Sequence, residues 1–222
     1  MRDDYIFISN NEWFECSSLK NPVCIMDYYM EKFYPEFYSH HYDARFLATK
    51  PATAEELASS IYNDYRERYG CADISCIDDE IIKIKPKSVL LNGFRQEHFN
   101  HIAPKLSETV EVIYFYKCPK IKDLSLLSQF RRLKCVLLFW NNSLECLWDM
   151  KNNVQLRVIS GSNISTLKDV STLEGSALEY VHFDSLDNSG HRKKMLFDAS
   201  VFSKMKNLKR LSLSFADCKV KN

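Results

Sequence analysis

The sequence predicts an α/β protein in which a mainly helical N-terminal region precedes a right-handed solenoid with a curved parallel sheet. Three observations predict this fold. Short apolar runs recur every 22 to 30 residues from about residue 86 onward. Helix capping signals and many aromatic residues mark the first 79 positions. Finally, 45% of the 222 residues are hydrophobic, which is enough to form a sizeable core.

Composition excludes several classes of function. The 30 basic and 29 acidic residues nearly cancel, which argues against an electrostatically driven nucleic-acid binder and against an acidic disordered tail. No apolar run approaches the length of a membrane span, and the first residues do not lead into a signal-peptide core. The eight cysteines contain no Cys-x-x-Cys pair, so we expect reduced thiols. These features favour a cytoplasmic protein with neither a nucleic-acid nor a membrane partner.

The N-terminal region, residues 1–79, has the signals of two helices. Asn21 and Pro22 are typical of a helix start, and aromatic residues then recur at helical spacing until Pro35. A capping box at residues 53–56 begins a second helix, which Gly70 ends. A short strand is expected at residues 81–84. We interpret the aromatic residues as core rather than as a cofactor site.

From residue 86 the chain repeats one apolar pattern. The clearest copy has Leu133, Val136, Leu138, Asn141 and Leu144 at its first, fourth, sixth, ninth and twelfth positions. Copies begin at residues 86, 110, 133, 156, 178 and 208. In each copy the fourth and sixth positions of a short strand face the core, and the third, fifth and seventh face outward.

This spacing and the L-x-x-L-x-L-x-x-N/C-x-L pattern resemble the leucine-rich repeat family over about residues 84–220. The resemblance implies that Cys118 and Asn141 satisfy the backbone of the turn that follows each strand. The copies also depart from the pattern. Gly161 occupies a core position, and Asn163 comes one position early. Leu186 and Ala216 stand where Asn or Cys is expected.

The outward strand positions predict a surface for a protein partner, because solenoids of this kind bind on the concave face. In the copies that begin at 110 and 133 these positions are mostly apolar or aromatic, as in interface anchors. Alternatively, the N-terminal region or the array itself covers these outward side chains, and they do not bind a partner. The candidate partner-binding residues are Val112, Tyr114, Tyr116, Leu137, Phe139, Trp140, Tyr180, His182 and Asp184.

No motif indicates catalysis. The chain has no Gly-rich phosphate loop, no Gly-x-Ser-x-Gly elbow and no His-Glu-x-x-His sequence. His98 and His101 lie three apart on an expected helix, but no further ligand at zinc spacing joins them. We therefore expect a protein that is not an enzyme and has no cofactor, metal or catalytic residue.

The function that the sequence favours is a non-catalytic protein–protein interaction module, with a solenoid domain at residues 80–222. One alternative is an inhibitor or immunity-type protein that occludes a toxin or an enzyme. Another is an enzyme whose site lies in residues 1–79. Only two residues follow Val220, so the array lacks a C-terminal cap. We expect that end to be covered by a partner, a second copy or further repeats of a longer protein.

Overall fold

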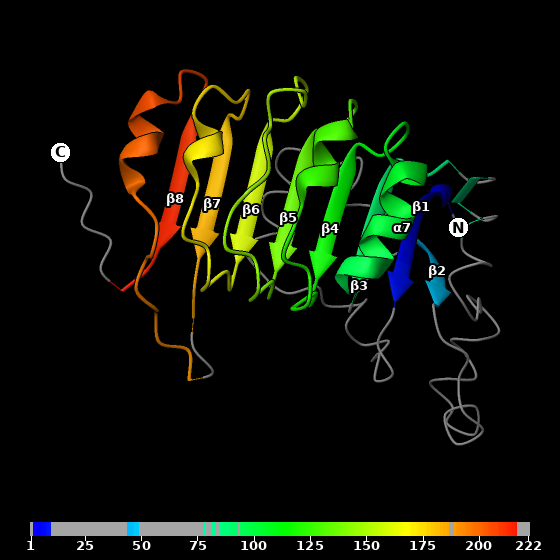
Figure 1. The fold of residues 1–222 in the computed structure, drawn as a ribbon, viewed down its shortest axis with the longest axis horizontal. Coiled ribbons are helices and arrows are strands. Elements are labelled where there is room, and N and C mark those ends of the chain that lie inside the picture. The colour runs from blue at the N-terminus through cyan, green and yellow to red at the C-terminus, as the bar shows by residue number, and fades with distance from the viewer. Residues whose placement is uncertain are drawn as a thin grey trace.

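A computed structural model describes residues 2–9, 44–48, 78, 81, 82, 85–92, 94–186 and 189–216. All eight strands of the described chain form one parallel sheet in the order β2-β1-β3-β4-β5-β6-β7-β8 (Figure 1). The strands are β1 (Arg2–Ser9), β2 (Ala44–Ala48), β3 (Ser88–Asn92), β4 (Val112–Tyr116), β5 (Cys135–Phe139), β6 (Val158–Ser162), β7 (Tyr180–Asp184) and β8 (Arg210–Ser214).

The predicted register is confirmed from β3 to β8. Each of these strands covers the third to the seventh position of its copy, and each pairs in parallel with the strand of the next copy. Val136 and Leu138, the fourth and sixth positions of one copy, are fully buried. The apolar period therefore predicts both where the strands lie and which side chains form the core.

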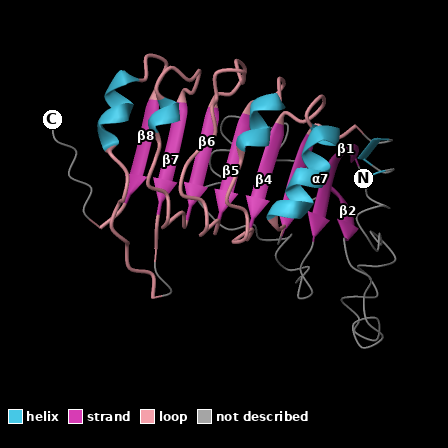
Figure 2. Cartoon of the chain, viewed as in Figure 1, coloured by secondary structure: helices cyan, strands magenta, loops and turns pink. Residues whose placement is uncertain are grey.

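Helical segments lie on one face of the sheet (Figure 2). They are the α-helix α7 (Gln96–Leu106) and the 3₁₀ helices η2 (Ser125–Gln129), η3 (Ser171–Leu173) and η4 (Ala199–Lys204). Each 3₁₀ helix starts at an Asp-x-Ser sequence, in which the aspartate accepts a hydrogen bond from the serine backbone N–H. The three aspartates are Asp123, Asp169 and Asp198. Such Asx turns satisfy a donor that the start of a helix leaves unpaired.

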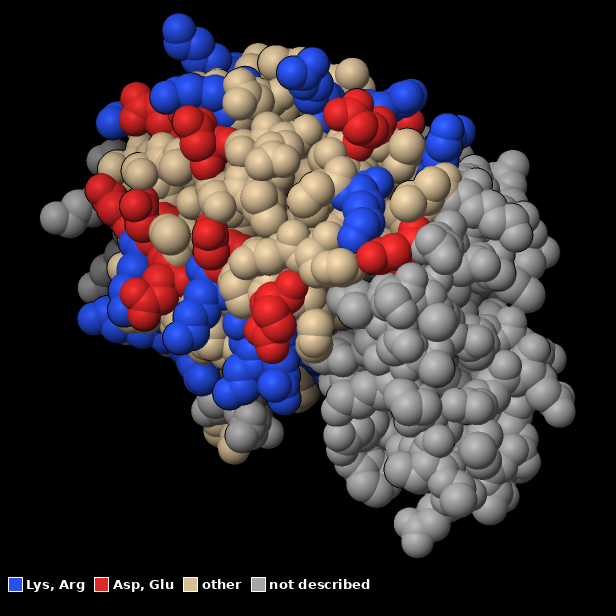
Figure 3. Space-filling model, turned by 45° about the vertical axis from the view of Figure 1, so that its right-hand side comes forward, with Lys and Arg blue, Asp and Glu red and all other residues tan. Residues whose placement is uncertain are grey.

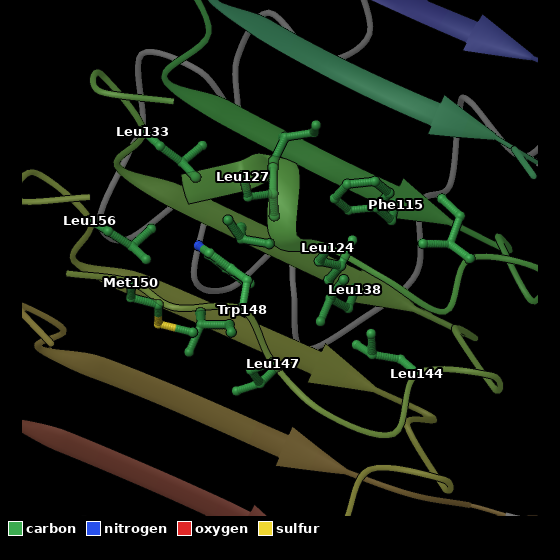
Figure 4. Close-up of a cluster of buried hydrophobic side chains, with 14 of the residues drawn as sticks. Phe115, Leu124, Leu127, Leu133, Leu138, Leu144, Leu147, Trp148, Met150 and Leu156 are labelled. Atoms are coloured by element: carbon green, nitrogen blue, oxygen red, sulfur yellow. The ribbon is translucent and has the colours of Figure 1, made fainter. Parts of the chain in front are cut away.

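The main core lies between the sheet and these helical segments. Figure 4 shows Phe115 and Leu138 of neighbouring strands facing Leu124, Leu127 and other side chains of the connecting segments. Gly161 takes a core position where the side chains of Ile164 and Phe183 fill the space that a larger residue would need. A Cβ at this position would lie 2.8 Å from Cδ1 of Ile164 and 3.0 Å from Cδ1 of Phe183. A leucine at this position would need these two side chains to move.

The side chains of Cys118 and Asn141 each bond to the backbone of the preceding copy. The Cys118 thiol donates to the Leu91 carbonyl oxygen at 3.2 Å, and Nδ2 of Asn141 donates to the Cys118 carbonyl oxygen at 3.3 Å. The early position of Asn163 also has a physical cause. Its φ is +58°, in the left-handed region where asparagine is favoured among residues other than glycine.

The prediction of a mainly helical N-terminal region is not confirmed. β1 and β2 come from residues 1–79, and β1 pairs with β3, so the sheet continues across the expected boundary at residues 79–80. The run Tyr5-Ile6-Phe7-Ile8 is rich in β-branched and aromatic residues, which favour strands. The helices expected after Asn21 and after the capping box at 53–56 lie outside the described residues.

Two further expectations are wrong. Ile81 and Ile82 are helical rather than part of a strand. In the segment before β6, Val154 is 65% exposed and its neighbour Asn153 is buried. Leu211, expected in the core, is 38% exposed, and none of the described strands lies beyond β8 to cover it.

Candidate functional site

Four side chains cluster where β4 and β5 end, and we call them the aromatic edge cluster: Tyr116, Lys117, Phe139 and Trp140. Tyr116 and Phe139 pair in register, and their rings stack with centroids 5.2 Å apart and planes 7° apart. The Trp140 ring stacks on Phe139 at 5.7 Å. Nζ of Lys117 lies 5.3 Å from the Tyr116 ring centroid and 5.5 Å from that of Trp140, within reach of a cation–π interaction.

The turn geometry gives Trp140 its exposure. Lys117 and Trp140 both have positive φ, at +49° and +57°, and each follows the last residue of a strand. The Lys117 N–H donates to the Phe139 carbonyl oxygen at 2.7 Å, and the Trp140 N–H donates to the Ser162 carbonyl oxygen at 3.0 Å. Trp140 is 38% exposed, whereas Tyr116 and Phe139 are half-buried. The cluster therefore offers a partly open aromatic surface.

The rest of the predicted partner surface is not exposed. Val112, Tyr114 and Leu137 face outward from the main core, yet all three are buried. His182 and Asp184 are also buried, and Tyr180 is half-buried. Their burial favours the alternative prediction, in which the N-terminal region or the array itself covers this face. The structure thus leaves four aromatic members of the predicted set at least partly accessible, and three of them, Tyr116, Phe139 and Trp140, stack together.

The buried polar members form a hydrogen-bonded group around Asp184. One carboxylate oxygen of Asp184 accepts from the Ser162 hydroxyl at 2.6 Å and lies 3.1 Å from Nε2 of His182. The other oxygen accepts from the Asn163 backbone N–H at 2.9 Å. Serine and histidine both bond to the carboxylate, so the histidine does not lie between the other two as a general base must. We interpret the group as a structural link between β6, β7 and the turn after β6.

This group makes stability depend on pH. Burial raises the pKa of Asp184, but hydrogen bonds from His182, Ser162 and the Asn163 N–H, with the charge of His182, outweigh it and hold the pKa below 3.8. A carboxyl group with a lowered folded-state pKa stabilises the fold above its unfolded pKa, and this contribution disappears as pH falls through the folded pKa.

We therefore expect the stability difference between wild type and Asp184→Asn to be largest above about pH 4 and to shrink at lower pH. Urea unfolding of both proteins across acidic pH measures this difference, and carboxyl groups common to both proteins cancel. A difference that stays constant with pH contradicts the role given to the Asp184 carboxylate.

A row of charged side chains at the second position of the copies escaped the sequence analysis. Nζ of Lys134 lies 2.5 Å from a Glu111 carboxylate oxygen, and Glu179 pairs with Arg157 at 3.5 Å and with Lys209 at 2.7 Å. Aligning the second position of successive copies could have found the row, because each ion pair joins neighbouring copies.

Figure 3 shows charged side chains of both signs around an uncharged central region on the side of the molecule facing the viewer.

The two histidines considered as metal ligands have other partners. Nε2 of His101 lies 2.8 Å from a carboxylate oxygen of Asp78, and Nζ of Lys105 lies 2.8 Å from the same oxygen. Nδ1 of His98 accepts from the Arg95 backbone N–H at 3.4 Å, at the start of α7. Within the described ranges, no three His, Cys, Asp or Glu side chains lie close enough together to hold a metal ion.

The described cysteines differ in environment. Cys118 and Cys135 are buried, and burial raises the pKa of the Cys135 thiol well above its ordinary value. Cys146 is exposed on the segment after β5. The remaining five cysteines lie outside the described residues.

No family model, curated protein or solved structure matches this chain. The resemblance to leucine-rich repeats therefore depends on the repeated residues and their register. None of the helices in the described part of the chain has both the length and the apolar character needed to cross a membrane.

Proposed function

We propose that this protein is a non-catalytic interaction module of the leucine-rich-repeat type, and that a protein partner docks on the aromatic edge cluster. The observation that carries the proposal is the stack of Tyr116, Phe139 and Trp140 with Trp140 partly exposed. Aromatic side chains that are already held in place lose little conformational entropy on binding, and they dominate the energetics of many interfaces.

The position of the cluster supports this proposal. Tyr116 and Phe139 end strands, and the backbone N–H groups of Lys117 and Trp140 bond to neighbouring copies, so partner binding need not order a loop. Lys117 adds a cation beside the rings, which favours a partner with a carboxylate or an aromatic ring near its own anchor residue. The inward residues of the same strands keep the sheet folded, so binding and stability depend on different side chains.

Truncation of the cluster tests the proposal. We expect Trp140→Ala and Phe139→Ala each to weaken partner binding by about 2 kcal/mol, or roughly 30-fold, while the thermal midpoint changes little. A partner is first isolated by affinity capture and identified by mass spectrometry, and its affinity for each purified variant is then measured by calorimetry.

Val154→Ala is the matched control, because Val154 is an exposed apolar residue outside the cluster. It should leave the affinity unchanged. If the partner binds Trp140→Ala and Phe139→Ala as tightly as wild type, the docking surface lies elsewhere and the proposal fails.

A further inference from the structure

A hairpin extends past the carboxyl ends of the strands, on the side of the sheet where the aromatic edge cluster also lies. The copies that begin at 178 and 208 are 30 residues apart, whereas the other intervals are 22 to 24 residues. Within this longer copy, Leu186 and Arg192 form an antiparallel bridge after β7. We call Leu186 and residues 189–196 the insertion hairpin. Figure 1 shows this part of the chain beyond the arrowheads of β7 and β8.

Backbone hydrogen bonds fix the base of the insertion hairpin. The Lys193 N–H donates to the Ser185 carbonyl oxygen at 2.8 Å, and the Ala216 N–H donates to the Lys193 carbonyl oxygen at 2.8 Å. Ser185 directly follows β7, and Ala216 lies two residues beyond β8. The backbone thus attaches the hairpin to the carboxyl ends of both strands, so its position does not depend on its charged side chains.

Three consecutive cations of the insertion hairpin are exposed: Arg192, Lys193 and Lys194. None of the three forms an ion pair within the part of the chain that the structure describes. Residues 186–197 contain one acidic residue, Asp187, so the insertion is basic overall. A carboxylate of a partner could therefore pair with these cations without breaking an ion pair among the described residues.

The turns after β5, β6 and β7 connect the aromatic edge cluster to the insertion hairpin. The Trp140 N–H donates to the Ser162 carbonyl oxygen, and Oδ1 of the next residue, Asn163, accepts from the Leu186 N–H at 2.9 Å. Leu186 is 37% exposed and Asn163 is half-buried. Along the carboxyl ends of β5 to β7, an aromatic surface is therefore followed by an amide, a partly exposed leucine and then the cations.

The spacing of the strands sets the length of a segment that contacts both ends of this surface. Neighbouring strands lie about 4.8 Å apart, so the ends of β5 and β7 are separated by roughly 10 Å. An extended chain advances about 3.3 Å per residue. Acidic residues about three to five positions from an anchor on the aromatic edge cluster would thus reach the insertion hairpin.

We propose that the partner docks through an acidic segment that crosses the carboxyl ends of β5 to β7. An aromatic or aliphatic residue of the segment packs on the aromatic edge cluster, and its carboxylates pair with the cations of the insertion hairpin. This assignment rests on the proposed function, because it extends the same docking surface and names the chemistry of the partner. The anchor supplies affinity, and the charges fix the direction of the segment.

Two other anionic partners fit this surface less well. The chain has a formal net charge of +1, and a run of three cations neutralises few phosphates of a nucleic acid. An anionic membrane is favoured by larger basic clusters than this one. An acidic protein segment needs only a few cations beside an apolar anchor site, which is what the carboxyl ends of the strands provide.

A defined peptide tests the surface directly. The probe is a labelled peptide with one tryptophan, a glycine and serine spacer of about four residues, and a run of glutamates. It is titrated with the full chain and followed by fluorescence anisotropy. We expect saturable binding that weakens as salt increases. Lysines in place of the glutamates, or glycine in place of the tryptophan, should each weaken binding at least about tenfold.

Charge reversal in the protein locates the acidic end of the peptide. Arg192→Glu with Lys194→Glu should weaken binding of the glutamate peptide at least about tenfold and strengthen binding of the lysine peptide. This gain also shows that the variant is folded. Arg131→Glu with Lys206→Glu is the matched control, because it changes the net charge equally at exposed residues that precede β5 and β8. It should bind the glutamate peptide like wild type.

Trp140→Ala distinguishes failure of this proposal from failure of the proposed function. If it weakens peptide binding while the charges of the peptide and of the insertion hairpin have no effect, the aromatic edge cluster remains a docking site and the acidic segment is wrong. If charge reversal weakens binding and Trp140→Ala does not, the surface is not continuous and the proposal fails. If neither changes binding, both proposals fail for this peptide.

Other probes can overturn the choice of partner. Absence of saturable binding of the glutamate peptide contradicts the proposal, while the partner isolated by affinity capture still tests the proposed function. Tighter binding of phosphatidylserine vesicles or of single-stranded oligothymidine than of the glutamate peptide would show that a membrane or a nucleic acid is the true ligand of the hairpin.

Discussion

Leu138→Ala is expected to lower the free energy of unfolding by about 2–5 kcal/mol. Leu138 is fully buried at the centre of the cluster in Figure 4, between the sheet and the connecting segments. Removing its isobutyl group loses the transfer free energy of the buried atoms and leaves a cavity that packed neighbours cannot fill. Urea denaturation followed by circular dichroism measures the change.

Leu211→Ala is the matched control for this experiment. It removes the same atoms from an inward position of another strand, but Leu211 is 38% exposed. We expect a clearly smaller loss, because less apolar surface returns to water. Leu137 does not serve as this control. It faces away from the main core but is itself buried. If Leu138→Ala and Leu211→Ala destabilise the protein equally, the assignment of the core is wrong.

Asn153→Ala is expected to destabilise the protein by about 3 kcal/mol, because it leaves several buried polar groups unpaired. Asn153 is fully buried. Its Nδ2 donates to the carbonyl oxygens of Leu127 and Phe130 at 2.8 and 2.9 Å, and its Oδ1 accepts from the Trp148 indole N–H at 2.8 Å. One side chain therefore supplies hydrogen-bond partners both for two carbonyl oxygens at the end of η2 and for the indole N–H of Trp148.

The neighbouring Asn152 provides the control for Asn153→Ala. Asn152 is exposed, so Asn152→Ala should change the free energy of unfolding by less than about 0.5 kcal/mol. Thermal and urea unfolding of both variants give the comparison. Equal effects of the two substitutions would show that the hydrogen bonds of Asn153 contribute little.

The sequence predicts the strands of the repeat region well because burial imposes a period on it. Val136 and Leu138 repeat in register with the apolar residues of neighbouring copies, and the same spacing in each copy fixes which residues pair. Asn153 shows the limit of this reasoning. A buried asparagine beside an exposed valine reverses the usual preference, and only the positions of its three partners explain it.

The candidate site was harder to predict because exposure depends on the whole molecule. Alternation along β4 and β5 predicts correctly that Tyr114 and Leu137 face away from the main core, but it does not predict that they are buried. Trp140, a predicted member of the surface, is 38% exposed and lies in a turn with positive φ. The strands of the N-terminal region were missed for a different reason, because its aromatic residues suit both helical packing and strands.

The charge row at the second positions changes its pairing between β5 and β6. Glu111 pairs with Lys134, and Arg157, Glu179 and Lys209 form the next group, so the two groups meet as cation beside cation. Lys134 belongs to the copy of β5 and Arg157 to that of β6, so no ion pair of this row joins these two copies. Their junction depends instead on the parallel pairing of β5 with β6, on the shared core, and on a different ion pair between Lys168 and Glu145 at 2.9 Å. Exposed ion pairs contribute little to stability, so cohesion along the array comes from strand pairing and burial rather than from the charge row.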